Sequence, residues 1–144
     1  MNTTQAGAAS VPIEHITPSQ FLSQSAMRFG ERPALVFMGF SITYNTLTDL
    51  VNRFAQSLTD LGVRPGDRVA IMLPNLPQTV VANYAVLRMG AIAVMVNPLY
   101  TVPELTHLLN DSGAETLIKL LETESFTALG GVPTIFVGLI NHQR

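Results

Sequence analysis

The sequence predicts an α/β fold, with a parallel βαβαβ core preceded by a helix and a β-hairpin. Three observations carry this prediction. Apolar runs at 68–73 and 91–96 are typical of strands that are buried on both faces. Segments with helical spacing of apolar residues alternate with these runs. Strands that alternate with helices favour right-handed crossovers, so we expect the strands to lie parallel in one sheet.

The N-terminal region begins with residues 1–16, which show no periodicity and are expected to form a disordered tail. Thr17-Pro18-Ser19-Gln20 then forms a capping box with proline at the first helical position. We expect this helix to run to Phe29 and to end at Gly30, in the left-handed conformation that glycine favours.

A hairpin and a long helix are expected next. The β-prone runs 34–37 and 41–44 flank the turn residues 38–40, which is the pattern of two antiparallel strands. Between 47 and 61, apolar residues recur at spacings of three and four, which predicts an amphipathic helix. Gly62 follows directly and is expected to end it.

The core elements follow in the order strand, helix, strand, helix, strand. They are expected at 68–73, 78–89, 91–96, 101–113 and 115–121. Thr101-Val102-Pro103-Glu104 is a second capping box and opens the later helix. Near the C-terminus, Gly130-Gly131 precedes Val132-Pro133, which predicts a turn into a further helix.

Composition limits the chain to one domain, because 144 residues are too few for two well-packed ones. Hydrophobic residues make up 47% of the chain and charged residues only 12%, which is about half the usual share of charge. Such a composition fits either a very buried fold or an incomplete domain whose normal partner surface is missing. The incomplete domain is the preferred interpretation.

Charge, cysteine content and targeting signals exclude several classes of protein. The net charge is −2 and the eight basic residues are scattered, so no nucleic-acid partner is expected. The absence of cysteine excludes disulfides, thiolate chemistry and zinc–thiolate sites. Residues 1–12 lack the pattern of a signal peptide, and the longest apolar stretch, 91–96, is far below the ~20 residues of a transmembrane segment. A soluble, cytoplasmic protein is therefore expected.

Catalytic and metal-binding constellations are missing from the sequence. His15, His107 and His142 stand far apart, with no second ligand at i+3 or i+4. The only lysine, Lys119, lies in the apolar run 117–121 without the glycines and hydroxyl residue of a phosphate-binding loop. Neither a nucleophile elbow nor the glycine pattern of a dinucleotide-binding fold occurs. We therefore assign no catalytic, cofactor-binding or metal-binding residue.

A family resemblance begins at Ser41. Several segments, in order, resemble core motifs of the adenylate-forming (AMP-binding) acyl-CoA ligases, and are most similar to bacterial medium- and long-chain fatty-acid–CoA ligases. These segments are 42–47, 61–70, 73–75, 87–98, 101–104 and 111–114. Thr46 and Met89 depart from the family pattern, which usually has glutamate and alanine at these places.

The resemblance implies the fold of an incomplete N-terminal subdomain of that ligase family. It also implies the reaction of the complete enzyme, which uses ATP, Mg and CoA. In that reaction ATP and a fatty acid give an acyl-adenylate and pyrophosphate, and CoA then displaces AMP to form the thioester.

The C-terminal stretch resembles a different part of the family. Residues 127–136 look like a Gly-Val-Pro-Thr segment that occurs much later in these enzymes and leads into a helix beside the acyl pocket. By this resemblance, Val132 and Phe136 are candidate walls of the substrate pocket. The family's phosphate loop with its lysine, its Tyr-Gly-x-Thr-Glu motif and its C-terminal domain have no counterpart, and the join lies near 119–122. The expected regions are a disordered tail at 1–16, a partial AMP-binding domain at 17–119 and a displaced later segment, with the Gly-Val-Pro-Thr helix, at 120–144.

Two functional hypotheses remain open. The first is a catalytically incompetent fragment of an acyl-CoA ligase, which binds no cofactor by itself and takes fatty acid and CoA only if missing segments complete it. The second is a non-enzymatic interaction module that docks onto a partner chain through an exposed sheet edge and apolar faces. A small nucleotide-binding α/β domain is a third interpretation, with only the fold class behind it. Exposed apolar surface also favours self-association or aggregation of the isolated chain.

Overall fold

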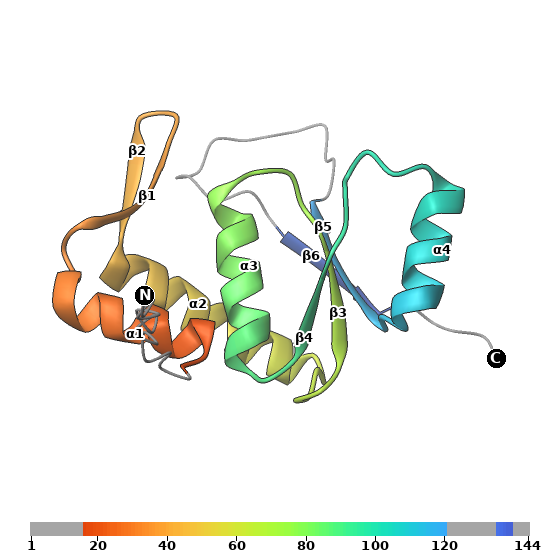
Figure 1. Ribbon diagram of the computed structural model, residues 1–144, viewed down its shortest axis with the longest axis horizontal. Coiled ribbons are helices and arrows are strands. Elements are labelled where there is room, and N and C mark those ends of the chain that lie inside the picture. The colour runs from red at the N-terminus through yellow and green to blue at the C-terminus, as the bar shows by residue number, and fades with distance from the viewer. Residues whose placement is uncertain (1–15, 121–134, 140–144) are drawn as a thin grey trace, which may run out of the picture.

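The computed structural model describes residues 16–120 and 135–139, which form two sheets and four helices (Figure 1). The elements are α1 (Pro18–Phe29), β1 (Pro33–Phe37), β2 (Phe40–Thr43), α2 (Tyr44–Asp60), β3 (Arg68–Met72), α3 (Pro77–Arg88), β4 (Ile92–Met95), α4 (Val102–Ser112), β5 (Thr116–Leu120) and β6 (Ile135–Leu139). The larger sheet has the order β4-β3-β5-β6, in which β4 and β5 both lie parallel to β3. The predicted α/β class, with its parallel core, N-terminal helix and hairpin, is confirmed.

The start of α1 is fixed by the capping box that the sequence predicts. The Gln20 amide donates to Thr17 Oγ1 at 3.2 Å, and the Thr17 amide donates to Gln20 Oε1 at 2.8 Å. These two bonds satisfy amides that the first turn leaves without a partner in the helix.

The left-handed end predicted for α1 is wrong. Gly30 has a φ of −43° and continues the right-handed conformation. Its role is a close approach: a Cβ at this position would lie 2.5 Å from Nδ2 of Asn45 at the start of α2, and the Asn45 amide donates to the Gly30 carbonyl. A glycine at a helix end serves both purposes, so the sequence alone does not separate them.

The hairpin turns through Met38 and Gly39, which both have positive φ, at 46° and 85°. Phe37 pairs with Phe40, so the loop holds two residues. Positive φ at both central positions gives the twist that joins antiparallel strands tightly. The predicted hairpin is confirmed.

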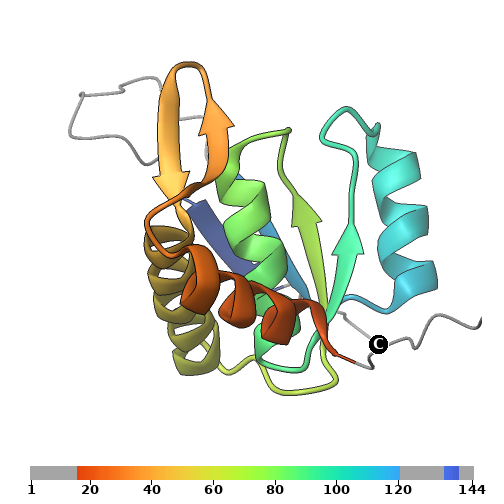
Figure 2. The same ribbon diagram turned by 60° about the vertical axis from the view of Figure 1, so that its left-hand side comes forward.

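The main core lies on one face of the larger sheet, beneath α1, α2 and α3 (Figure 2). Val51 and Leu58 of α2 pack there with Ile71 of β3 and Ile118 of β5, and all four are fully buried. The three-and-four spacing in α2 therefore sets which side of that helix is covered.

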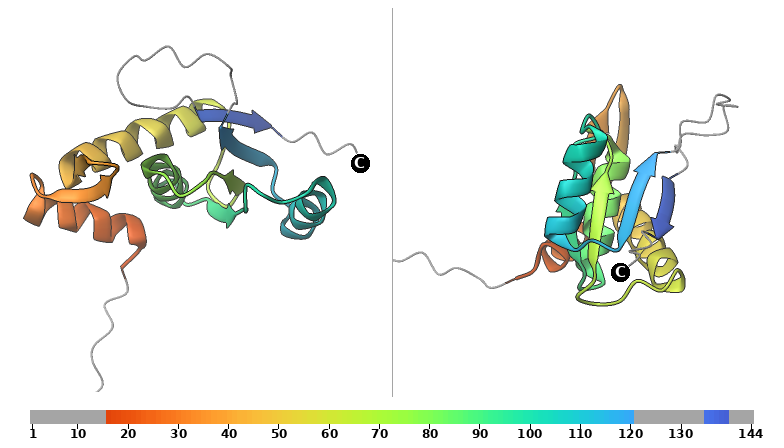
Figure 3. Two further views of the ribbon diagram at one scale, coloured as in Figure 1. Left: turned by 90° about the horizontal axis from the view of Figure 1, so that it is seen from above. Right: turned by 90° about the vertical axis from the view of Figure 1, so that its right-hand side faces the viewer.

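The opposite face of the sheet is covered by α4 (Figure 3). The buried residues on this face of the sheet are few and small, namely Ala70, Val96 and Ala114. Half-buried leucines of α4 pack around them. No residue of α4 itself is buried. The second face is therefore much less complete than the first.

The C-terminal part differs from the sequence-based prediction. Ile135–Leu139 form β6, antiparallel to β5, and not the helix expected after Pro133. Strand pairing explains the difference, because β5 without β6 would leave a row of unpaired backbone groups. The rest of 120–144 lies almost entirely outside the described residues, as does nearly all of the tail predicted at 1–16. Among the described helices, none has the length and apolar character needed to cross a bilayer.

Candidate functional site

The carboxyl ends of the parallel strands meet at one edge of the sheet, where open α/β sheets bind their ligands. The loop after β3 and the loop after β4 both lie there, at the top of Figure 1. After β3, the chain adds β4 on one side of β3 and then β5 on the other side. The strand order therefore reverses between β3 and β5. This edge is the first candidate for a site.

Several polar groups of these two loops form hydrogen bonds within the loops themselves. Thr79 Oγ1 donates to the carbonyl of Pro74, and the Leu76 amide donates to the same carbonyl. Asn97 Oδ1 accepts the Leu99 amide at 3.0 Å, and its carbonyl accepts the Tyr100 amide at 3.1 Å. Such bonds fix turn conformations and occupy the groups that form them.

One cation lies at this edge. Lys119 is exposed near the end of β5, in register with Met72 of β3. Within the described residues it forms no salt bridge, and no group of acidic or histidine side chains capable of holding a metal ion is found there. The described part of the edge can attract an anion but has no acid, base or nucleophile around it.

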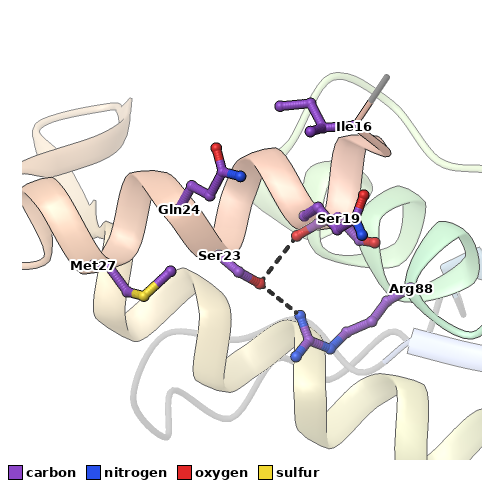
Figure 4. Close-up of a pocket in the computed structure, with 7 residues that line it drawn as sticks. Ile16, Ser19, Ser23, Gln24, Met27 and Arg88 are labelled. Atoms are coloured by element: carbon purple, nitrogen blue, oxygen red, sulfur yellow. Dashed lines mark hydrogen bonds between the residues drawn. The ribbon is translucent and has the colours of Figure 1, made fainter. Parts of the chain in front are cut away.

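Two shallow grooves occur elsewhere on the described surface. The larger, of about 500 Å³, lies between α1 and the end of α3 and is drawn in Figure 4. Arg88 Nη1 donates to Ser23 Oγ at 3.2 Å, and Ser23 Oγ donates to the carbonyl of Ser19. Because this hydroxyl is already both donor and acceptor, the groove presents one guanidinium and amide side chains but no reactive group.

The second groove, of about 300 Å³, runs along α4 and is lined by Tyr100, Glu104, His107, Leu108 and Asp111. Glu104 accepts bonds from the Thr101 hydroxyl and amide at 2.7 and 2.8 Å. These bonds hold the pKa of the Glu104 carboxyl below its usual range, and the bond from the Thr101 hydroxyl has the larger effect. The carboxylate therefore caps the helix as the sequence predicts, and is not a free acid or base.

The predicted pocket residues are not brought together by the described part of the structure. Val132 lies outside it, and the backbone of Phe136 is in β6, in register with Lys119. Both assignments stay predictions. Of the three histidines only His107 is described, in the α4 groove.

Sequence reasoning missed one surface feature. The run 91–96 was expected to be buried on both faces, but Ile92 and Met95 of β4 are about half exposed. The sequence shows that β4 is apolar and uncharged, but it does not show which strand lies at the edge of the sheet.

The AMP-binding enzyme family model matches residues 22–124. The long-chain-fatty-acid–CoA ligase of Escherichia coli O6:H1 is 46% identical over 117 residues, which cover 76% of this chain and 21% of that protein. The Bacillus subtilis protein of the same name is 40% identical over 110 residues, 76% of this chain and 20% of the relative. The chain thus spans about a fifth of the length of these curated relatives.

Solved structures show the same similarity. The N-terminal subdomain of Klebsiella oxytoca NpsA, in complex with 3-hydroxybenzoyl-AMSN, matches with a TM-score of 0.69 and 28% identity, over 70% of this chain and 26% of that one. The inhibitor-bound N-terminal domain of FACL13 from Mycobacterium tuberculosis matches with a TM-score of 0.67 and 33% identity, over the same shares.

Proposed function

This chain belongs to the AMP-binding enzyme family, and we propose that it is the N-terminal structural part of a long-chain fatty-acid–CoA ligase that does not activate fatty acids by itself. The complete reaction joins the fatty-acid carboxylate to the α-phosphorus of ATP with release of pyrophosphate. CoA thiol then attacks the acyl carbon and AMP leaves. The support for the acyl-CoA class comes from relatives with 40–46% identity.

The inactivity proposal is supported by the small number of charged groups at the carboxyl edge of the sheet. Charge that develops on phosphate oxygens and leaving groups must be stabilised by fixed cations or oriented donors. Lys119 is the one cation that the described edge offers, and the Asn97 loop is closed by internal hydrogen bonds. One exposed ammonium on a strand end is a poor substitute for an enclosed phosphate cradle.

The described residues do not fit the cofactors of the complete family enzyme. ATP would need a phosphate-binding loop, and Mg would need carboxylate or carbonyl oxygens gathered around one point. Neither arrangement occurs within 16–120 and 135–139. ATP, Mg, fatty acid and CoA are therefore proposed as ligands of the completed protein, with no binding step assigned to this chain.

ATP–pyrophosphate exchange with a panel of medium- and long-chain fatty acids tests the inactivity proposal. We expect the purified chain to exchange no label above the buffer rate, and the Escherichia coli ligase assayed alongside to exchange it readily. Lys119→Ala serves as a matched control and should change nothing. Fatty-acid-dependent exchange by the wild-type chain, lost in Lys119→Ala, would show that the inactivity proposal is wrong.

A second candidate function is an interaction module that docks onto a partner chain. The open edge of β4 favours it, together with the exposed apolar side chains of Leu99, before α4, and Val102, the first residue of α4. Surfaces of this kind usually mark interaction sites or aggregation hazards. A stable, monodisperse monomer with low binding of a hydrophobic dye would count against this candidate.

A further inference from the structure

We propose that the open edge of β4 receives a parallel β-strand from the part of the AMP-binding domain that lies outside the aligned region of this chain. The inference rests on the proposed function and names the docking surface and the partner segment that it needs. The surface is called the β4 edge below, and consists of the outer backbone of β4 with the side chains of Ile92 and Met95.

The backbone of β4 is paired on one side only. The sheet order places β3 on one flank of β4 and no described strand on the other. The Ile92 amide donates to the Asp67 carbonyl at 2.8 Å, and the Val96 amide donates to the Ile71 carbonyl at 3.0 Å. Since successive residues of a strand direct these groups to alternate sides, the amides of Ala93 and Met95 point to the open flank.

Apolar side chains are uncovered on both faces of this edge. Ile92 is in register with Arg68 and Met95 with Ile71, so the two side chains lie on opposite faces of the sheet. Ile92 is 48% exposed and Met95 is 53% exposed. A docked helix would cover one of these faces, whereas a further strand with its own side chains would cover both.

The β4 edge also lacks the features that protect natural edge strands. Such strands usually carry a charge, a proline or a bulge that prevents pairing. The sequence of β4 is Ile92-Ala93-Val94-Met95, and its register with β3 is unbroken. This is the composition of an interior strand in a parallel sheet.

The similar structures indicate where the missing strand comes from. The chain matches solved N-terminal subdomains at a TM-score of 0.69 but covers only 26% of their length. The remainder of that subdomain is therefore large enough to supply both a strand and the helices that flank it. A second copy of this chain fits less well, because two β4 edges related by a two-fold axis would run antiparallel and pair only four residues each. Four residues a side are far fewer than the roughly 20–30 a side of a standard interface.

The test co-expresses the tagged chain with the part of the Escherichia coli ligase that lies beyond its 117 aligned residues. Met95→Pro removes the outward amide while sparing the bonds to β3, and Met95→Lys places a charge on the edge. Met27→Lys is the matched control, because Met27 is 80% exposed on α1, away from the β4 edge. Circular dichroism of each purified variant shows whether the chain still folds.

We expect the wild-type chain and Met27→Lys to capture the ligase remainder, and Met95→Pro and Met95→Lys to capture at least tenfold less. In hydrogen exchange, the Met95 amide should exchange at least tenfold more slowly in the complex. Failure of the wild-type chain to capture the remainder would overturn the proposal, as would equal capture by folded Met95→Pro. A discrete dimer of the chain alone with protected Ala93 and Met95 amides would also overturn it, in favour of a second copy.

The test distinguishes failure of the β4 edge proposal from failure of the proposed function. A complex that forms through Met95 but shows no ATP–pyrophosphate exchange would leave the edge proposal standing and contradict the acyl-activating role. A complex that shows exchange but is insensitive to both Met95 variants would support the acyl-activating role and contradict the edge proposal.

Discussion

At the scale of single residues, the clearest departure from relaxed geometry is Met38. Its φ of 46° lies in the left-handed region, which costs a residue with a Cβ about 1–2 kcal/mol. Its side chain is 83% exposed, so the position has little packing to lose. The hairpin is therefore held together by the packing at its base, where Leu35 and Ile42 lie against the main core, and not by its loop residue.

Replacing Met38 with asparagine should raise the free energy of unfolding by about 0.5–1 kcal/mol, because Asn-Gly is the preferred loop of a two-residue hairpin. Urea unfolding followed by circular dichroism measures the change. Met27→Asn is the control, since Met27 lies within α1, where asparagine is a weaker helix former than methionine. A Met38→Asn variant no more stable than the wild type would show that the turn is not strained.

Glu104 gives a pH-dependent prediction at the same scale. Its bonds to Thr101 lower the pKa of the carboxyl below the ordinary value of 4.5. A carboxyl with a depressed folded pKa stabilises the fold fully above its unfolded pKa and loses that contribution as pH falls through its folded pKa. Stability should thus decline from about pH 4.5 downward.

Glu104→Gln should flatten this part of the curve, because a neutral amide keeps a capping oxygen without titrating. The urea midpoints of the two proteins are measured at a series of pH values from about 5 down to about 2.5 and are then compared. Asp60→Asn on α2 controls for loss of one exposed carboxylate. Parallel curves for Glu104→Gln and the wild type would contradict the assigned cap.

At the scale of elements, α2 joins the hairpin to the sheet and makes more contact with α3 than with any other element. Leu58 near its end is fully buried among the main core. Leu58→Ala should cost about 2–5 kcal/mol by removing buried methyl groups and leaving a cavity. Leu61→Ala, one residue beyond α2 and half exposed, should cost well under half as much. Equal losses in urea unfolding would contradict the packing of α2.

Most of these elements could be predicted because their signals are local. The capping boxes at Thr17 and Thr101, the spacing of α2 and the turn at Gly39 depend on residues close together in sequence. The end of α1 could not, because Gly30 lies against the side chain of Asn45 from another element. The position of β4 at the edge and the pairing of β6 with β5 are also non-local, and short apolar runs do not encode them.

The site could be predicted only in outline. The lack of a phosphate loop follows from the sequence, whereas the place of Lys119 beside the end of β3 depends on the pairing of β5. The groove between α1 and α3 could not be found from sequence, because Arg88 and Ser23 are 65 positions apart. The pocket assignments of Val132 and Phe136 depend on the family resemblance and are still predictions.

At the scale of the whole molecule, the two faces of the sheet are unequally finished. One face lies beneath α1, α2 and α3 with a large buried cluster, while the other has α4 and three small buried residues. Together with the open β4 edge, this asymmetry is what we expect of a part of a larger domain.

The most direct measurement is therefore ATP–pyrophosphate exchange by three samples: the chain alone, the Escherichia coli ligase remainder alone, and the two co-expressed. We predict fatty-acid-dependent exchange in the co-expressed sample only, with its loss in Met95→Pro. Exchange by the chain alone would contradict the proposal that it is an inactive structural part. A co-expressed complex without exchange would contradict its place in a fatty-acid–CoA ligase.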